Sequence, residues 1–148
     1  MLKNHLNSIL GIAIVCLLTA CQTAPIRVIF PAENLPVSDW SKADLEKNIA
    51  IKHLERTKTS SSHLIRLRGS EKPHFHDKHD LTVTVLRGES IIHFKSREQI
   101  LKAGDVVHIP KGNYHWAENT GVGASVVFAV FSPAFDGKDK RFVDKHKK

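Results

Sequence analysis

Two histidine-bearing stretches lie within a long run of short β-like segments. The first is His74-Phe75-His76, and in the second His115 follows Pro110 and Gly112. Successive side chains of a strand alternate between its two faces, so His74 and His76 should project together. A glycine at 112 gives the backbone the freedom to reverse direction before His115. The pattern predicts that these imidazoles converge within a small β-sheet structure.

The chain from residue 49 onward consists of segments rich in Ile, Val, Thr and Phe, separated by Gly, Ser, Asn or charged pairs. Such segments are typical of strands, and we predict them at 49–56, 62–68, 74–76, 81–86, 90–95, 99–102, 106–110, 115–118 and 125–131. Many short strands without a helical period between them indicate an antiparallel sandwich or barrel. A length of 148 residues suits one domain with a single core.

The second histidine stretch resembles the second motif of the cupin family, with every fixed position filled by Gly104, Pro110, Gly112, His115 and Asn119. The first cupin motif is similar to the stretch that holds Gly69, His74, His76 and Gly88. The resemblance implies an all-β fold, a single antiparallel double-stranded β-helix that forms the cupin jelly-roll barrel. A Ser or Asp available as N-cap predicts a short helix at 38–47, before the barrel.

Imidazole nitrogens suit first-row divalent metals, so the resemblance implies a metal site formed by His74, His76 and His115. The ligand set does not distinguish Fe, Mn, Zn or Ni. The Glu of the usual first motif falls on Leu81, which cannot bind a metal. Asp80 is the first candidate for a fourth ligand, although strand alternation turns it away from the face of Leu81 unless a bulge re-aims it. His79 is the alternative metal ligand, and a bare three-histidine site is the third.

The remaining strand histidines have no partner in either motif, and we interpret them as surface or packing residues: His53, His63, His93 and His108. The chain has no Gly-rich phosphate loop, no Cys-x-x-Cys pair and no Gly-x-Ser-x-Gly elbow.

The amino terminus has the features of an export signal. Lys3 precedes an apolar segment at 9–18 that is about half of the ~20 residues of a spanning helix. The sequence Leu18-Thr19-Ala20-Cys21 resembles the lipobox of bacterial lipoproteins. That resemblance implies a signal peptide at 1–20, lipidation of Cys21 and attachment to a membrane in the cell envelope. The alternative is an ordinary secreted protein.

We divide the rest of the chain into a lipidated N-terminus and tether at 21–37, a cupin β-barrel domain at 38–135 that includes the short helix, and a basic tail at 136–148. For a Gram-negative source, Gln22 in place of Asp favours the periplasmic side of the outer membrane. The net charge of +7 reflects scattered Lys and Arg, which favours a solvated surface over contact with anionic lipid head groups. Nucleic acid is not an expected partner, because an exported lipoprotein rarely meets it.

Three functional hypotheses remain open. The first is a metal-dependent cupin enzyme, dioxygenase-like or isomerase-like, that acts on a small molecule, with its catalytic residues unknown. The second is a module that binds a small molecule or a metal for sensing. The third is an envelope scaffold without metal. Cupins often pair through sheet edges, so the resemblance is compatible with a homodimer under all three.

Overall fold

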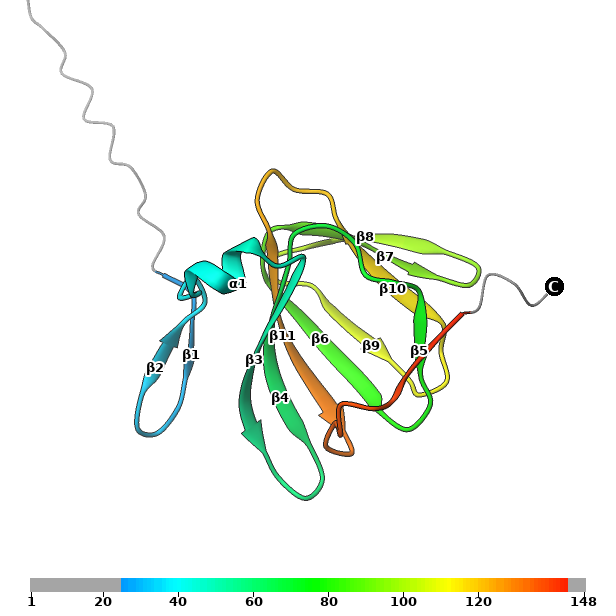
Figure 1. Ribbon diagram of the computed structural model, residues 1–148, viewed down its shortest axis with the longest axis horizontal. Helices are drawn as coiled ribbons and strands as arrows, with labels where there is room; N and C mark the ends of the chain where they lie inside the picture. Colours follow the sequence, from blue (N-terminus) through cyan, green and yellow to red (C-terminus); the bar gives the residue numbers. More distant parts are fainter. Residues whose placement is uncertain (1–24, 144–148) are drawn as a thin grey trace, which may run out of the picture.

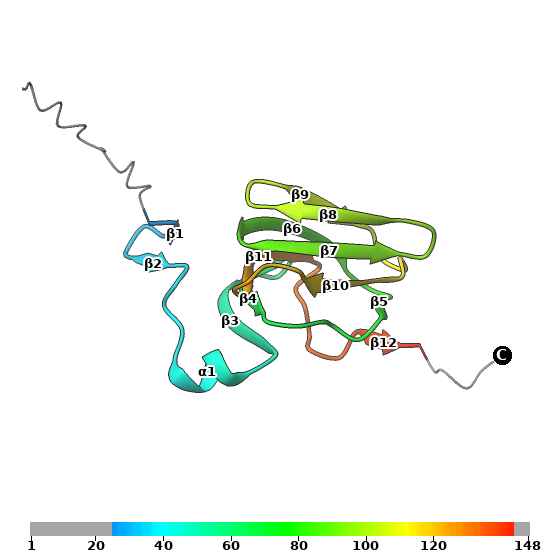
Figure 2. The same cartoon turned by 90° about the horizontal axis from the view of Figure 1, so that it is seen from above.

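The computed structural model describes residues 25–143, in which two five-stranded antiparallel sheets form the walls of a barrel (Figures 1 and 2). One sheet has the order β3, β4, β11, β6, β9, with bounds Ile49–Arg56, Ser61–Leu67, Ser125–Ser132, Asp80–Arg87 and Val106–Ile109. The other has the order β12, β5, β10, β7, β8, with bounds Lys140–Phe142, His74–His76, His115–Asn119, Glu89–Phe94 and Glu98–Lys102. The predicted all-β jelly-roll architecture is confirmed.

The main core lies between the two sheets. Strand alternation turns every second side chain inward, and the inward positions hold Leu81, Val85, Ala129, Phe131 and Ile109 from the first sheet. Ile92 and Leu101 enter the same cluster from the second sheet. Each strand predicted between residues 49 and 131 is present, with ends that differ by one residue at most. The period of two in the sequence therefore identified the barrel wall correctly.

The segment before the barrel carries more structure than a tether. Strands β1, Arg27–Ile29, and β2, Asn34–Pro36, form a hairpin, and α1, Lys42–Glu46, follows. The hydroxyl of Ser41 caps α1 by accepting a hydrogen bond from the backbone N–H of Asp44 at 3.1 Å. The predicted short helix is thus present within the expected range.

A second apolar cluster joins this amino-terminal segment to the outer side of the first sheet. Val37 and Trp40 pack with Ala50, Leu64 and Val126, and all five are buried. The indole N–H of Trp40 donates to the carbonyl of Val37 at 2.8 Å. Figure 1 shows the hairpin and α1 beside β3 and β4. Part of the range expected as a tether is therefore packed against the barrel.

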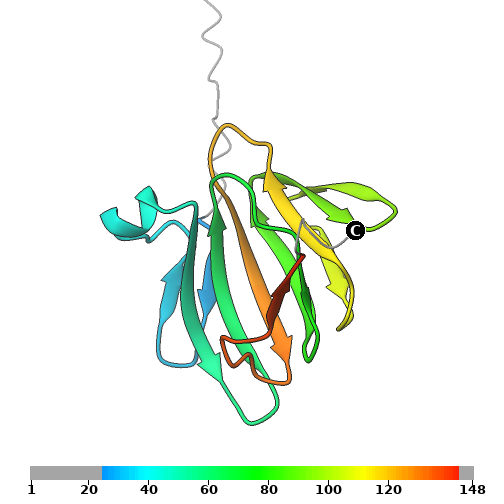
Figure 3. The same cartoon turned by 45° about the vertical axis from the view of Figure 1, so that its right-hand side comes forward.

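The carboxyl-terminal segment returns to the barrel. Strand β12 lies within the range expected as a basic tail and pairs with β5, with Lys140 opposite His76 and Phe142 opposite His74. Figure 3 shows β12 along the outer edge of the second sheet. A three-residue strand that covers an otherwise open edge satisfies backbone groups of β5. The structure thereby brings the segment after Gly137 next to both histidines.

The predicted signal peptide at 1–20 and Cys21 lie outside the described residues. Over residues 25–143, no helix has the length and apolar character that crossing a bilayer requires.

Candidate metal centre

Three buried histidines meet on the inner face of the second sheet. His74 on β5 lies directly opposite His115 on β10, so their side chains share one face, and their ring centroids are 4.6 Å apart. The ring of His76, two residues further along β5, lies 5.0 Å from that of His74 and 5.6 Å from that of His115. One nitrogen from each ring lies within 4.8 Å of the others. The predicted convergence of the three imidazoles is confirmed.

The loop before β10 is held against β5 by Gly112. This residue has φ +76°, in the left-handed region that favours glycine, and its N–H donates to the carbonyl of His76 at 2.7 Å. The bond fixes the β9–β10 loop to the strand that carries the other two histidines. The glycine at this position therefore helps to place His115.

Two of the three imidazoles have a fixed proton position. Nδ1 of His74 lies 2.8 Å from the carbonyl oxygen of Lys72, and Nδ1 of His115 lies 2.9 Å from that of Asn113. A carbonyl can only accept, so in each ring Nδ1 carries the proton and Nε2 holds a lone pair. Proteins usually orient a metal-binding histidine in this way, with the nitrogen that does not bind the metal donating a hydrogen bond to a carbonyl or carboxylate.

Burial keeps the three rings neutral. It lowers the pKa of His74 to about 4, with a further contribution from the charge of Lys140. Burial also lowers the pKa of His76 to about 3, assisted by its two histidine neighbours, and it lowers the pKa of His115. Neutral imidazoles bind cations without first losing a proton. The donor set therefore fits a first-row divalent metal at neutral pH.

The two candidates for a fourth ligand lie elsewhere. Asp80 points away from the cavity, and its Oδ1 accepts a hydrogen bond from the backbone N–H of Lys111 at 2.9 Å. His79 is buried, and its Nδ1 lies 2.5 Å from Oδ2 of Asp139. Within residues 25–143, the cluster contains the three histidines and neither of these residues. Leu81 faces the cavity, as strand alternation predicts.

The histidine cluster opens into a cavity of about 90 Å³ inside the barrel. Its walls are mostly apolar, and the charged residues that line it besides the histidines are Glu71 and Lys140. Oε2 of Glu71 accepts a hydrogen bond from the backbone N–H of Ala117 at 3.1 Å, and Oε1 lies 3.5 Å from Nζ of Lys140. The cavity thus combines a metal-ligand set with one carboxylate and one ammonium group.

The sequence did not identify these two charged residues as part of the site. Neither histidine motif includes Glu71, and Lys140 falls in the range expected as a basic tail. Lys140, Arg141 and Phe142 show little alternation, and three residues are too few to establish a strand from sequence. The register of β12 against β5 sets Lys140 opposite His76, where it lines the cavity while remaining exposed to solvent.

The other four strand histidines do not enter the cluster. His53 contacts His63 through their Nδ1 atoms at 3.0 Å, and His93 stacks on Trp116 with ring centroids 4.3 Å apart. His108 lies on the outer face, where its Nδ1 is 3.2 Å from the hydroxyl of Thr82. Their interpretation as packing or surface residues agrees with these positions.

Residues 64–131, which span both histidine-bearing strands, match the family model described as the cupin domain. The chain is a cupin-domain protein. This cupin is 42% identical over 93 residues to an uncharacterized protein of Aquifex aeolicus, which corresponds to 63% of this chain and 76% of the relative.

Solved structures give the same fold. KdgF from Halomonas sp. superposes with a TM-score of 0.60 at 28% identity, covering 67% of this chain and 89% of that one. An RmlC-like cupin from Shewanella frigidimarina has a TM-score of 0.56 at 22% identity, covering 61% and 80%. Streptomyces Pac13, described as a nucleoside dehydratase, has a TM-score of 0.57 at 16% identity, covering 65% and 78%, so it shows the fold alone.

Proposed function

We propose that this cupin binds one divalent metal ion through His74, His76 and His115 and acts on a small molecule in the adjoining cavity. The observation that carries the proposal is the meeting of three buried imidazoles, two of which have Nε2 free because Nδ1 donates to a carbonyl. Three protein ligands leave coordination positions for a ligand, as in catalytic rather than closed structural sites. A bound divalent cation supplies Lewis-acid polarisation of a substrate oxygen.

The charged residues of the cavity favour a proton-transfer reaction, such as an isomerisation, on an anionic or oxygen-rich substrate. Lys140 offers a positive charge for a substrate carboxylate or oxygen. Glu71 can take a proton from the substrate and return it at a neighbouring atom. The apolar walls limit water around the reacting atoms.

The first test is the metal content of the full chain, purified in a non-ionic detergent. We expect stoichiometric metal in the wild-type protein and its loss in both His74→Ala and His115→Ala. His108→Ala is the matched control, because this exposed histidine lies outside the cluster. A wild-type protein that binds no divalent metal, or metal retained in both site variants, would refute the proposal.

A second candidate function is a non-catalytic binding module, and Leu81 favours it. Its buried side chain, 6% exposed, occupies the position of the acidic residue in the usual motif and leaves the site without that negative charge. Assays of the metal-loaded wild type and of Glu71→Gln with candidate small molecules separate the two. An enzyme that uses Glu71 would lose turnover while keeping its metal, whereas a binding module would show no turnover in either form.

We also propose that the barrel is anchored to a membrane through acyl chains on Cys21. The described chain begins at Pro25, and the four residue steps from Cys21 span at most about 14 Å. An anchor there would hold the β1–β2 hairpin close to the lipid surface. Two or more acyl chains suffice for stable attachment.

Expression of the full chain in a bacterial host tests the anchor. The wild-type protein should sediment with membranes and carry an acylated amino-terminal cysteine by mass spectrometry, whereas Cys21→Ser should lack the modification. Cys16→Ser, in the segment expected to be removed, is the control and should behave as wild type. An unacylated mature wild-type protein would refute the anchor without affecting the metal proposal.

A further inference from the structure

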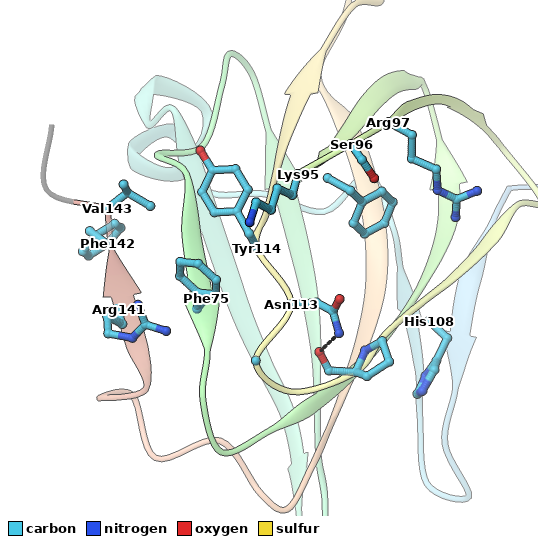
Figure 4. Close-up of a pocket in the computed structure, with 13 residues that line it drawn as sticks. Phe75, Lys95, Ser96, Arg97, His108, Asn113, Tyr114, Arg141, Phe142 and Val143 are labelled. Carbon is cyan, nitrogen blue, oxygen red and sulfur yellow. Dashed lines mark hydrogen bonds between the residues drawn. The ribbon is translucent and has the colours of Figure 1, made fainter. Parts of the chain in front are cut away.

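A groove lies beside the histidine-bearing strand β5, and Phe75 lines it from the face of that strand opposite to His74 and His76. Its volume is about 980 Å³, and it is lined by residues of β5, β12, the β7–β8 turn and the β9–β10 loop (Figure 4). Phe75 alternates with His74 and His76, Tyr114 precedes His115, and Arg141 follows Lys140. No residue lines both this groove and the metal cavity. We call this second site the outer groove.

Positive charge dominates the outer groove. Its lining contains Lys95, Arg97 and Arg141, and no Asp or Glu. The guanidinium of Arg141 is held by both carboxylate oxygens of Asp77, at 2.6 and 2.8 Å. In the described part of the chain, Lys95 and Arg97 form no ion pair, and both side chains are exposed on the β7–β8 turn. Two cations are therefore available to an anion.

Aromatic rings form the floor of the same groove. The ring of Tyr114 lies 5.3 Å from that of Phe75, and the guanidinium of Arg141 lies over the ring of Phe75, 4.1 Å from its centroid. On the opposite wall, the guanidinium of Arg97 lies 5.3 Å from the ring of Phe94. Planar groups in this arrangement offer stacking surfaces to a ring of a ligand.

We propose that the outer groove binds a small anion that carries a planar ring, such as an aromatic carboxylate or an aromatic phosphate monoester. Lys95 and Arg97 pair with the negative charge, and Tyr114 packs against the ring. The volume lies at the upper end of the range of about 300–1,000 Å³ for small-molecule sites. Charge-assisted hydrogen bonds and stacking add to each other, so a ligand with both features should bind best.

The probe for the experiment is phenyl phosphate, with phenol and inorganic phosphate as its two halves. Titration of the metal-free full chain should show phenyl phosphate binding about tenfold more tightly than either half, which corresponds to about 1.4 kcal/mol. The affinity should fall as salt is added, because exposed charges are screened. Equal affinity for inorganic phosphate and phenyl phosphate would overturn the proposal, as would no binding at millimolar phenyl phosphate.

Tyr114 is the chain's single tyrosine, and it reports on the groove without any mutation. Its ring signals in the NMR spectrum of tyrosine-labelled protein should shift on addition of phenyl phosphate. Binding that leaves these signals unchanged places the ligand elsewhere and overturns the proposal. Phenyl phosphate binding that requires added metal also overturns the proposal. So does a protein that binds anionic lipid vesicles but not phenyl phosphate.

The double variant Lys95→Gln with Arg97→Gln should weaken phenyl phosphate binding by about tenfold or more. The control is Lys58→Gln with Arg68→Gln, which removes the same charge from exposed positions outside the groove and should leave the affinity unchanged. Tyr114→Leu should abolish the preference over inorganic phosphate, and Tyr114→Phe should keep it. Equal loss in the groove variant and its control would show a net-charge effect and overturn the proposal.

Discussion

Nδ1 of His76 lies 3.7 Å from Oδ2 of Asp139, and both side chains are almost fully buried. This nitrogen is a buried polar atom without a hydrogen-bond partner, unlike Nδ1 of His74 and His115. The same carboxylate accepts from the backbone N–H of Lys78 at 3.1 Å. A small ring movement would let His76 donate to Asp139 and present Nε2 to a metal, completing the arrangement seen for the other two histidines.

Asp139→Asn should therefore weaken metal binding by about 10- to 100-fold, because the amide is a poorer acceptor for the His76 proton. Competition with a chromophoric chelator measures the affinity. The control is Asp136→Asn, an exposed carboxylate on the same segment. Unchanged metal affinity in a folded Asp139→Asn protein would show that Asp139 supports only His79 and the β5–β6 loop.

The metal-free protein should lose stability as the pH falls below 6.5. The unfolded histidines titrate near that value, while in the folded protein the pKa is about 4 for His74 and about 3 for His76. Between these values the unfolded state binds more protons, so its free energy falls relative to the folded state. Each histidine contributes up to about 1.4 kcal/mol per pH unit.

Urea unfolding at several pH values measures this dependence. His76→Gln should flatten it, because one low-pKa group is gone, while the exposed His108→Gln should follow the wild type. If the free energy of unfolding of His76→Gln follows the same pH dependence as that of the wild type, the low pKa assigned to His76 is contradicted.

Leu81→Glu should raise metal affinity and lower the stability of the metal-free protein. Leu81 lies on the cavity wall with the histidines, so a carboxylate there would add negative charge beside the cation. Without metal, the buried carboxylate has no cation to pair with, and its burial lowers the free energy of unfolding by several kcal/mol. Calorimetric titration and thermal unfolding measure the two effects. Leu81→Met, which keeps the apolar character, should change neither by much, and a lower metal affinity in Leu81→Glu would refute the expectation.

Trp40→Ala should reduce the free energy of unfolding by about 3–5 kcal/mol, because Trp40 joins the amino-terminal segment to the outer side of the sheet. Denaturant titration measures the loss. Leu45→Ala is the control, since Leu45 on α1 is 42% exposed. A small effect at Trp40 would show that the segment before the barrel is only loosely attached.

The barrel wall and the histidine cluster could be predicted because both depend on local patterns. Alternation along β5 placed His74 and His76 on one face. The spacing of Pro110 and Gly112 before His115 indicated that His115 begins another strand, which is β10. The strands β1, β2 and β12 could not be predicted in this way, since each has three residues and little alternation. Their pairing is decided by the partners they meet in the folded chain.

Local patterns were enough to predict the two-residue period of the strands, the reversal of the backbone at Gly112 and the residue types able to bind a metal. Long-range strand pairing places Asp139 and Lys140 beside those histidines, and Lys140 next to Glu71, because β12 pairs with β5 from a point far along the chain. Strand alternation already turned Asp80 away, and the hydrogen bond from Lys111 agrees with it, whereas long-range packing brings Phe75, Tyr114 and Arg141 together in the outer groove. Side-chain alternation is local, whereas which strands lie side by side depends on the packing of the whole barrel.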